Sequence, residues 1–406
     1  MLASETDRGR RWLSNFQAVD QPTARQLLDA LELVGQDEWR SSLRQLLNGL
    51  PAKITGPMAL VPVRELPAGQ SYFSEGRDAA APLLDAEGLP GSEALVANLI
   101  TSLCREAGQG GPFVAPPSLD KMRTRKVRSI VLVDDFSGSG QRILGFLEAF
   151  RRHPTVASWR SLHLFDFHVA LYSATRPALE RLTRSFGTGH IHICRPCPTF
   201  ATRNWRHGER RDIEAFCRKY VSSRQKHAPF GFKGSRGLMA FVHTAPNNLP
   251  AVVWQTRGRG PGGAWRPFFE GKAVPDDLGP LFFVADPQRR LASALSRLGQ
   301  DSLAIKLDSL PPPWLWQRVL LALVAVGRNP RDDLRVAELT GLSLANTLEA
   351  VATARNYGLV TDRGLHLTDL GRSELRHAQS VGLPTAESSL KPSTLPYYPK
   401  SLRVGR

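Results

Sequence analysis

The chain has 406 residues, of which 42% are hydrophobic, enough to build a large core and to argue against general disorder. Lys and Arg number 53 against 37 Asp and Glu, so the formal net charge is +16, which favours a polyanionic partner. No run of about 18 apolar residues and no secretion signal is recognisable, and the four cysteines are too few for a disulfide scaffold, so we expect a cytoplasmic protein without a membrane span.

Residues 1–50 are predicted to form an N-terminal helical cap. Apolar residues spaced three and four apart indicate helices over 10–19, 23–35 and 37–50. Strands and helices then alternate. The predicted strands cover 58–63, 129–134, 162–172 and 190–194, and the helices between them cover 91–108, 139–152 and 176–187. This alternation is typical of a parallel α/β sheet, to which we assign residues 51–310.

A basic insert is predicted at 195–236, where 11 basic residues stand against 3 acidic ones. A helix is expected over 208–226, and aromatic residues are interleaved with the charges. Because Arg and Lys neutralise phosphates and aromatic rings stack on bases, the insert predicts a nucleic-acid contact, with a solvated basic surface as the alternative. The candidate contacts are Arg203, Arg206, Arg210, Arg211, Arg218 and Lys219. Two strands around a Pro-Asn-Asn turn are expected over 237–256.

The sequence predicts a winged helix over 311–380, followed by a Pro/Ser-rich tail over 381–406. The expected elements are helices over 314–327, 335–343 and 344–358, two short strands over 359–368 and a helix over 369–378. On DNA, the helix from Ser343 to Tyr357 would enter the major groove and Arg363 would lie at the tip of the wing. Arg318 to Arg376 holds eight basic and seven acidic residues, so docking on a protein or on structured nucleic acid is an equal alternative.

The segment VLVDDFSGSGQR, residues 131–142, joins an apolar strand to a helix through two acids and a loop of small residues. The backbone N–H groups of such a loop and the helix N-terminus favour an anion. No Lys follows the glycines, so the segment is not a Walker A loop, and its spacing differs from the dinucleotide-binding fingerprint. The pattern therefore predicts a phosphate site, and the alternative is a structural turn with surface acids.

This order of apolar strand, paired acids, small residues, Ser and Gly resembles the signature of the phosphoribosyltransferase family. The resemblance implies that Asp134 and Asp135 are catalytic residues that contact the ribose hydroxyls of phosphoribosyl pyrophosphate, directly or through Mg²⁺. The implied cradle for the 5′-phosphate is Ser137, Gly138, Ser139 and Gly140.

The chain departs from that family at Gln141-Arg142, where a small residue and Thr are usual. Arg142 is expected to reach the phosphate as a charge, and its size is the reason that turnover is left open. Arg64 follows the predicted strand over 58–63, where the family places its pyrophosphate loop, and is the candidate pyrophosphate contact.

The similarity extends over most of the chain. The WLSNF helix, the acid loop, the HTAPNNLPAVVW and WRPFF segments and the winged helix together resemble phosphoribosyltransferase-like effectors of bacterial conflict systems, including retron-type anti-phage defence. The resemblance implies glycosyl transfer or glycosidic-bond cleavage at an anomeric carbon. It also implies restraint by a retron-type reverse transcriptase with its DNA–RNA product, and places His243 and Asn247 in the pocket.

Two further interpretations are open. His190, His192, Cys194 and Cys197 have a zinc-like spacing, but no second such pair is present, so buried thiols are favoured and no zinc is expected. The whole chain is alternatively a non-catalytic, ligand-sensing DNA-binding regulator, or a nucleic-acid scaffold with an inactive pocket.

Overall fold

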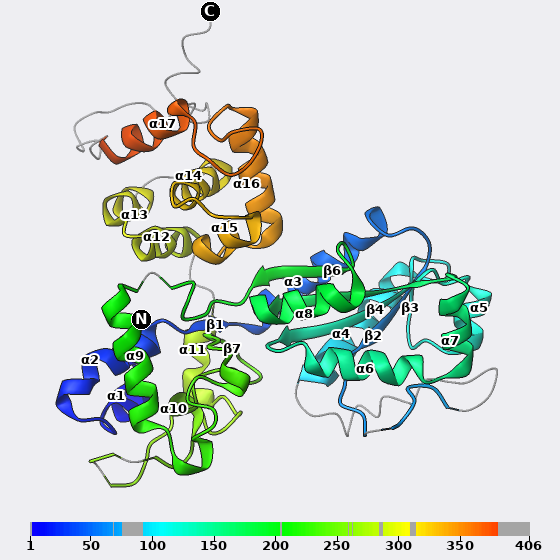
Figure 1. The fold of residues 1–406 in the computed structure, drawn as a ribbon, viewed down its shortest axis with the longest axis horizontal. Helices are drawn as coiled ribbons and strands as arrows, with labels where there is room; N and C mark the ends of the chain where they lie inside the picture. Colours follow the sequence, from blue (N-terminus) through cyan, green and yellow to red (C-terminus); the bar gives the residue numbers. More distant parts are fainter. Residues whose placement is uncertain are drawn as a thin grey trace, which may run out of the picture. The chain divides into compact units, whose positions relative to one another are not determined.

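The computed structural model describes residues 2–67, 69–74, 92–203, 205–258, 260–261, 263–283, 287–308 and 314–380 (Figure 1). The chain divides into two compact units. Unit 1 comprises Met1–Phe200 and Trp205–Phe283, and unit 2 comprises Ala201–Asn204 and Val284–Arg406. The domain boundary predicted at residue 311 therefore lies inside unit 2.

A five-stranded parallel sheet forms the centre of one half of unit 1 (Figure 1). Its strand order is β3-β2-β4-β5-β6, and all the neighbouring pairs are parallel. The strands are β2 (Met58–Pro62), β3 (Phe113–Val114), β4 (Ser129–Ser137), β5 (Asp166–Ala174) and β6 (Ile191–Pro196). The predicted α/β fold with a parallel sheet is confirmed.

Helices cover both faces of the sheet. On one face α3 (Gln36–Asn48) and α4 (Ser92–Ala107) pack against side chains that include Val131 and Val133 of β4. On the other face lie α6 (Gln141–Arg151) and α8 (Arg176–Phe186), as right-handed crossovers between β4, β5 and β6 require. The shorter helices of this region are α5 (Leu119–Thr124) and α7 (Pro154–Ser161), and neither is predicted from the sequence.

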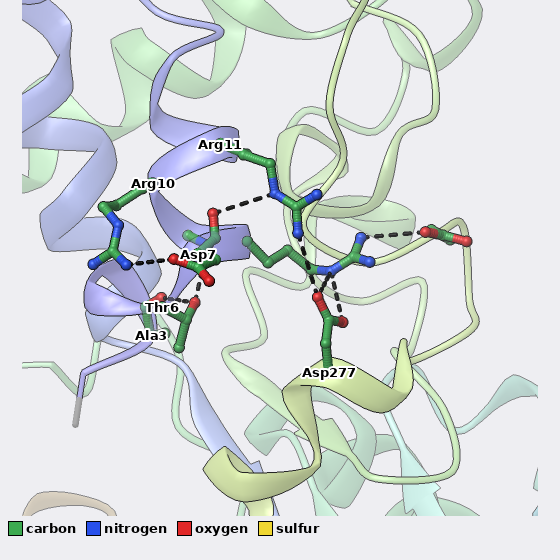
Figure 2. Close-up of polar contacts among 9 residues, drawn as sticks. Ala3, Thr6, Asp7, Arg10, Arg11 and Asp277 are labelled. Atoms are coloured by element: carbon green, nitrogen blue, oxygen red, sulfur yellow. Dashed lines mark hydrogen bonds and ion pairs between the residues drawn. The ribbon is translucent and has the colours of Figure 1, made fainter.

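A second core in unit 1 gathers α1 (Asp7–Leu13), α2 (Gln21–Asp29) and α9 (His207–Tyr220) with buried side chains between residues 238 and 282. The Trp12 indole donates to the carbonyl of Val252 over 3.0 Å. Figure 2 shows Arg11 of α1 directed at Asp277, with Nη2 and Oδ2 3.5 Å apart. Because α1 and α2 join this core while α3 joins the sheet, the three predicted N-terminal helices do not form one cap.

Two predicted elements of unit 1 are wrong. The helix expected over 23–35 stops at Asp29, and β1 (Glu32–Val34) pairs in parallel with β7 (Met239–Phe241), because this pairing outweighs local helix propensity. The second strand expected within 237–256 is instead the short helix α10 (Ala251–Trp254), which begins after Pro250 and is buried in the second core.

Short elements complete unit 1. These are α11 (Gly279–Phe282) and the 3₁₀ helices η1 (Ala3–Glu5), η2 (Ala18–Asp20), η3 (Leu50–Ala52), η4 (Ser223–Gln225), η5 (Phe232–Gly234) and η6 (Asp276–Leu278).

Unit 2 has the order expected of a winged helix. Its helices are α12 (Pro287–Arg297), α13 (Asp301–Asp308), α14 (Trp314–Val326), α15 (Asp333–Thr340), α16 (Leu344–Asn356) and α17 (Asp369–Ser380). The two predicted wing strands are reduced to one antiparallel bridge between Val360 and Leu367. The predicted tail over 381–406 lies outside the described residues. Among the helices that are described, none is long and apolar enough to cross a membrane.

Candidate functional site

The two acids lie at the carboxyl end of β4, the central strand of the sheet. Asp134 is 1% and Asp135 3% exposed. The predicted strand ends at these acids, but β4 continues to Ser137, because Phe136 and Ser137 pair with residues of the equally long β5. The acids are therefore not surface residues of a turn. Buried carboxylates are costly unless they are paired or hydrogen-bonded, so their partners define the site.

Each acid has a partner from a different element. Nη2 of Arg142 donates to both carboxylate oxygens of Asp134, at 2.7 and 2.6 Å, and lies 3.8 Å from Oδ1 of Asp135. Nε2 of His243 lies 2.9 Å from Oδ2 of Asp135. Successive side chains of a strand point to opposite faces, which sends Asp134 toward α6 and Asp135 toward the segment after β7.

This arrangement separates the acidities of the two carboxyls. Burial raises the pKa of Asp134 well above its usual range, opposed by the Arg142 guanidinium and reinforced by the charge of Asp135. Burial also acts to raise the pKa of Asp135, but the hydrogen bond and charge of His243, with the charge of Arg142, lower it overall. Asp135 is thus the carboxylate that holds its negative charge most firmly.

Two residues from other elements reach the same edge of the sheet. Arg64 follows β2, is 9% exposed and lies over the ring of Tyr72, with its guanidinium carbon 5.5 Å from the ring centroid. Glu93 of α4 lies 3.7 Å from Nη1 of Arg142 through Oε1. Burial raises the pKa of Glu93, and Arg142 opposes this. The structure thus brings the predicted Arg64 and the unpredicted Glu93 to the edge that carries the acids.

The loop after the acids is held against a second segment. Gly140 has a φ of +74° and immediately precedes α6. The hydroxyl of Thr175 donates to the carbonyl of Gly138 over 2.6 Å. A Cβ atom on Gly138 would lie 1.9 Å from Nδ2 of Asn248, so only glycine fits against this amide. Ser137 is the last residue of β4 and is buried, whereas Ser139 follows Gly138 in the loop.

The segment after β7 contributes His243 and Asn248 to this edge of the sheet, and not the predicted Asn247. Asn247 is exposed, whereas Asn248 is 6% exposed and donates from Nδ2 to Oγ of Ser235 over 2.9 Å. The Asn-Asn dipeptide gave no sequence signal to distinguish these neighbours. The rings of Trp39 and Phe241 lie 5.4 and 5.3 Å from the His243 ring, centroid to centroid.

The comparisons with known proteins concern both units. Residues 10–270 match the family model described as PRTase-CE, more than half of the chain. The chain belongs to the PRTase-CE family. Residues 320–404 match the model described as wHTH-PRTase associated, so the predicted phosphoribosyltransferase-like domain followed by a winged helix is confirmed. No curated protein and no solved structure was found to match.

The basic insert of the PRTase-CE domain centres on α9. The candidate contacts Arg206, Arg211, Arg218 and Lys219 are exposed, whereas Arg203 and Arg210 are half-buried. Lys219 is paired with Asp20, Nζ to Oδ2 at 2.7 Å. The aromatic residues among these charges are predicted to stack on bases, and for most of them this is contradicted. The buried ones, which lie in the core that holds α9, are Phe200, Phe216, Tyr220 and Phe230.

In the winged helix, the predicted contact Arg363 lies on the wing, and the exposed positions of α16 carry no cation. Arg363 is exposed at the wing, as predicted, and Thr361 donates from Oγ1 to its carbonyl over 2.9 Å. The exposed positions of α16 are Ala345, Leu348, Glu349, Ala352 and Asn356, which include no cation. A surface of this composition suits a protein better than a phosphate backbone.

The His and Cys residues in and beside β6 form no recognisable metal site. Cys194 and Cys197 are buried in the core that also holds Trp39 and Phe241, and burial raises the pKa of Cys194. Nδ1 of His168 lies 3.3 Å from Nε2 of His192. Across the described ranges, no group of three or more His, Cys, Asp or Glu side chains is arranged to hold a metal ion.

Proposed function

We propose that this PRTase-CE protein is an effector of a bacterial anti-phage defence system that binds a ribose-5-phosphate ligand, phosphoribosyl pyrophosphate or a nucleotide. It acts at the anomeric carbon, by glycosyl transfer or by cleavage of an N-glycosidic bond. The observation that supports this most is the pair of buried carboxylates, Asp134 and Asp135, at the carboxyl end of the central strand. In open parallel sheets, ligands bind at this edge.

The chemistry of each group fits such a ligand. Carboxylates accept hydrogen bonds from vicinal hydroxyls, and the loop at the start of α6 favours a phosphate. The Arg142 side chain is 37% exposed, so it can leave Asp134 for a phosphate without unfolding its helix. Asp135 keeps its charge through His243 when Arg142 moves. A fixed negative charge of this kind stabilises the positive charge that develops at an anomeric carbon during reaction.

Magnesium fits this donor set as well. Mg²⁺ in phosphate-binding proteins takes one or two carboxylates and completes its shell with ligand oxygens and water. Asp134 and Asp135 would hold it, and the ion would supply charge neutralisation for a bound pyrophosphate. In this proposal Arg64 and Arg142 provide the protein's own positive charge at the same edge.

We propose that a partner, a reverse transcriptase with its DNA–RNA product, holds the effector inactive. The support is the resemblance to retron-type effectors and the exposed cations of α9 and Arg363. The alternative, a DNA-binding regulator, is less well supported because the exposed positions of α16 carry no cation.

The test is growth after induced expression, with soluble protein levels matched and nucleotide pools measured by mass spectrometry. The variant is Asp134→Asn/Asp135→Asn. The matched control is Asp120→Asn/Asp212→Asn, which removes the same two charges from exposed positions on α5 and α9. Co-expression of a reverse transcriptase encoded next to this gene tests the restraint.

We expect wild type and control to stop growth and shift the nucleotide pools, and the Asp134→Asn/Asp135→Asn chain to do neither. Relief of the arrest by the reverse transcriptase supports the partner. If all three chains behave alike, the enzymatic proposal is wrong. Titration of purified wild type with phosphoribosyl pyrophosphate then asks whether the acid pair binds a ligand without turnover.

A further inference from the structure

A cavity of about 520 Å³ lies at the opposite end of the sheet from the acids. It is formed by the end of α6, by α7, by the first residues of β5 and by the turn between α8 and β6. Because β5 runs in parallel with β4, its first residue Asp166 is at the amino edge, and the acid pair is at the carboxyl edge. The cavity therefore belongs to no part of the proposed active site.

The lining of the cavity includes more basic than acidic side chains. Arg151, Arg160, His163 and His190 line it, against a single acid, Asp166. Arg151 is also paired with Glu148, Nη1 to Oε1 at 2.9 Å, but Glu148 is 58% exposed and such surface pairs are weak. The Nε atom of Arg151 is buried and has no hydrogen-bond partner within the described chain. This atom is inaccessible to solvent, so a ligand would meet only the exposed end of the guanidinium.

Aromatic rings and hydroxyls accompany the cations. Phe165, Phe167 and Phe186 line the cavity, together with Ser161 and Ser185. The guanidinium of Arg151 lies 5.8 Å from the centroid of the Phe167 ring. Small-molecule sites typically span about 300–1,000 Å³ and combine apolar walls with a few placed polar groups. The cavity has this size and this mixture.

We infer that the cavity is a second ligand site that binds a free ribonucleoside monophosphate, with the phosphate on Arg151 and Arg160 and the base against the half-buried ring of Phe186. Arginine suits a phosphate because its N–H groups are always charged and can donate in pairs. Helix α6 carries Arg142 in its first turn and Arg151 at its last residue, so both ligands meet the same helix. The second site thus has a direct structural connection to the partner of Asp134.

The test is isothermal titration of the full chain with AMP, GMP, CMP and UMP, and with adenosine and inorganic phosphate for comparison. The variants are Arg160→Gln, at an exposed position, and Arg151→Gln. The matched control is Arg184→Gln, which removes the same charge from an exposed position on α8 beside the cavity. The Asp134→Asn/Asp135→Asn chain separates binding here from binding at the acids.

We expect at least one nucleotide to bind wild type, the control and the Asp134→Asn/Asp135→Asn chain with similar affinity. Each arginine variant should weaken this binding by about tenfold, as expected for one charged hydrogen bond to the phosphate. Adenosine and phosphate alone should bind more weakly. The inference is overturned if no nucleotide binds at millimolar concentration, or if binding is lost in the aspartate variant and retained in both arginine variants.

Discussion

Gly138 offers the sharpest test of how the loop after the acids is built. A Cβ atom at this position would lie 1.9, 2.2 and 2.3 Å from Nδ2, Cγ and Oδ1 of Asn248. The amide cannot move away freely, because its Nδ2 donates to Oγ of Ser235. The backbone of Asn248 is also fixed, since its carbonyl accepts from N of Gly237 over 3.1 Å. Gly138→Ala must therefore displace the amide or the loop.

The expected cost has two parts. Losing the hydrogen bond between Asn248 and Ser235 costs about 1 kcal/mol. Overpacking a buried contact adds about 1–3 kcal/mol. We expect Gly138→Ala to lower the free energy of unfolding by about 2–4 kcal/mol, measured by urea denaturation of the full chain. Binding of phosphoribosyl pyrophosphate should weaken in parallel, because the same loop is proposed to hold its phosphate.

The matched control is Gly145→Ala, in the middle of α6, where an added Cβ atom meets nothing within 4 Å. This change should stabilise the chain by about 0.5–1 kcal/mol, as Ala is the better helix former. Asn248→Ala added to Gly138→Ala makes room for the new methyl group and should recover part of the loss. A Gly138→Ala chain as stable as wild type would refute the close packing of Asn248 on the loop.

Two further predictions concern buried charge. Arg142→Gln leaves Asp134 unpaired and should lower the free energy of unfolding, measured by urea denaturation, by about 3 kcal/mol. Adding Asp134→Asn to this variant should recover most of the loss. If the losses of the two single variants simply add, the direct pair is contradicted. Burial lowers the pKa of His168 and of His192 to about 4 from 6.5. The two neutral histidines therefore contribute their full stability above pH 6.5, and the free energy of unfolding falls as the pH falls toward 4, by roughly 3 kcal/mol after discounting for partial exposure. His168→Gln/His192→Gln should flatten this part of the plot of unfolding free energy against pH. An unchanged slope in the variant would contradict the prediction.

The parts of the fold that the sequence predicts well are those decided by local pattern. Apolar strands followed by amphipathic helices identify β2, β4, β5 and β6 and the parallel sheet. The position of the acids on β4 follows directly from the run of apolar residues before them. The end of α2 at Asp29 could not be predicted in this way. The helix ends there because residues shortly after it pair with β7, some 200 positions further along the sequence.

The candidate site was only partly predictable, because its partners come from distant elements. Asp134 and Arg142 are eight residues apart, and helix geometry alone does not say whether the guanidinium turns to the acid or to a ligand. His243 was selected by resemblance, but its contact with Asp135 depends on the pairing of β7 with β1. Glu93 reaches the site through the fold of α4, and no local pattern singles it out.

The two acids are held by independent elements, and this shapes how the site can respond to a ligand. Asp134 is paired with Arg142 of α6, the helix that begins after the Ser/Gly loop, whereas Asp135 is held by His243 from the segment after β7. In the proposed function, a phosphate that attracts Arg142 would free Asp134 and leave Asp135 held by His243. One carboxylate would then become available to the ligand when its phosphate is bound, and the other would keep its charge. The proposal thus gives the departure at Arg142 a role, which is to couple phosphate binding to release of Asp134.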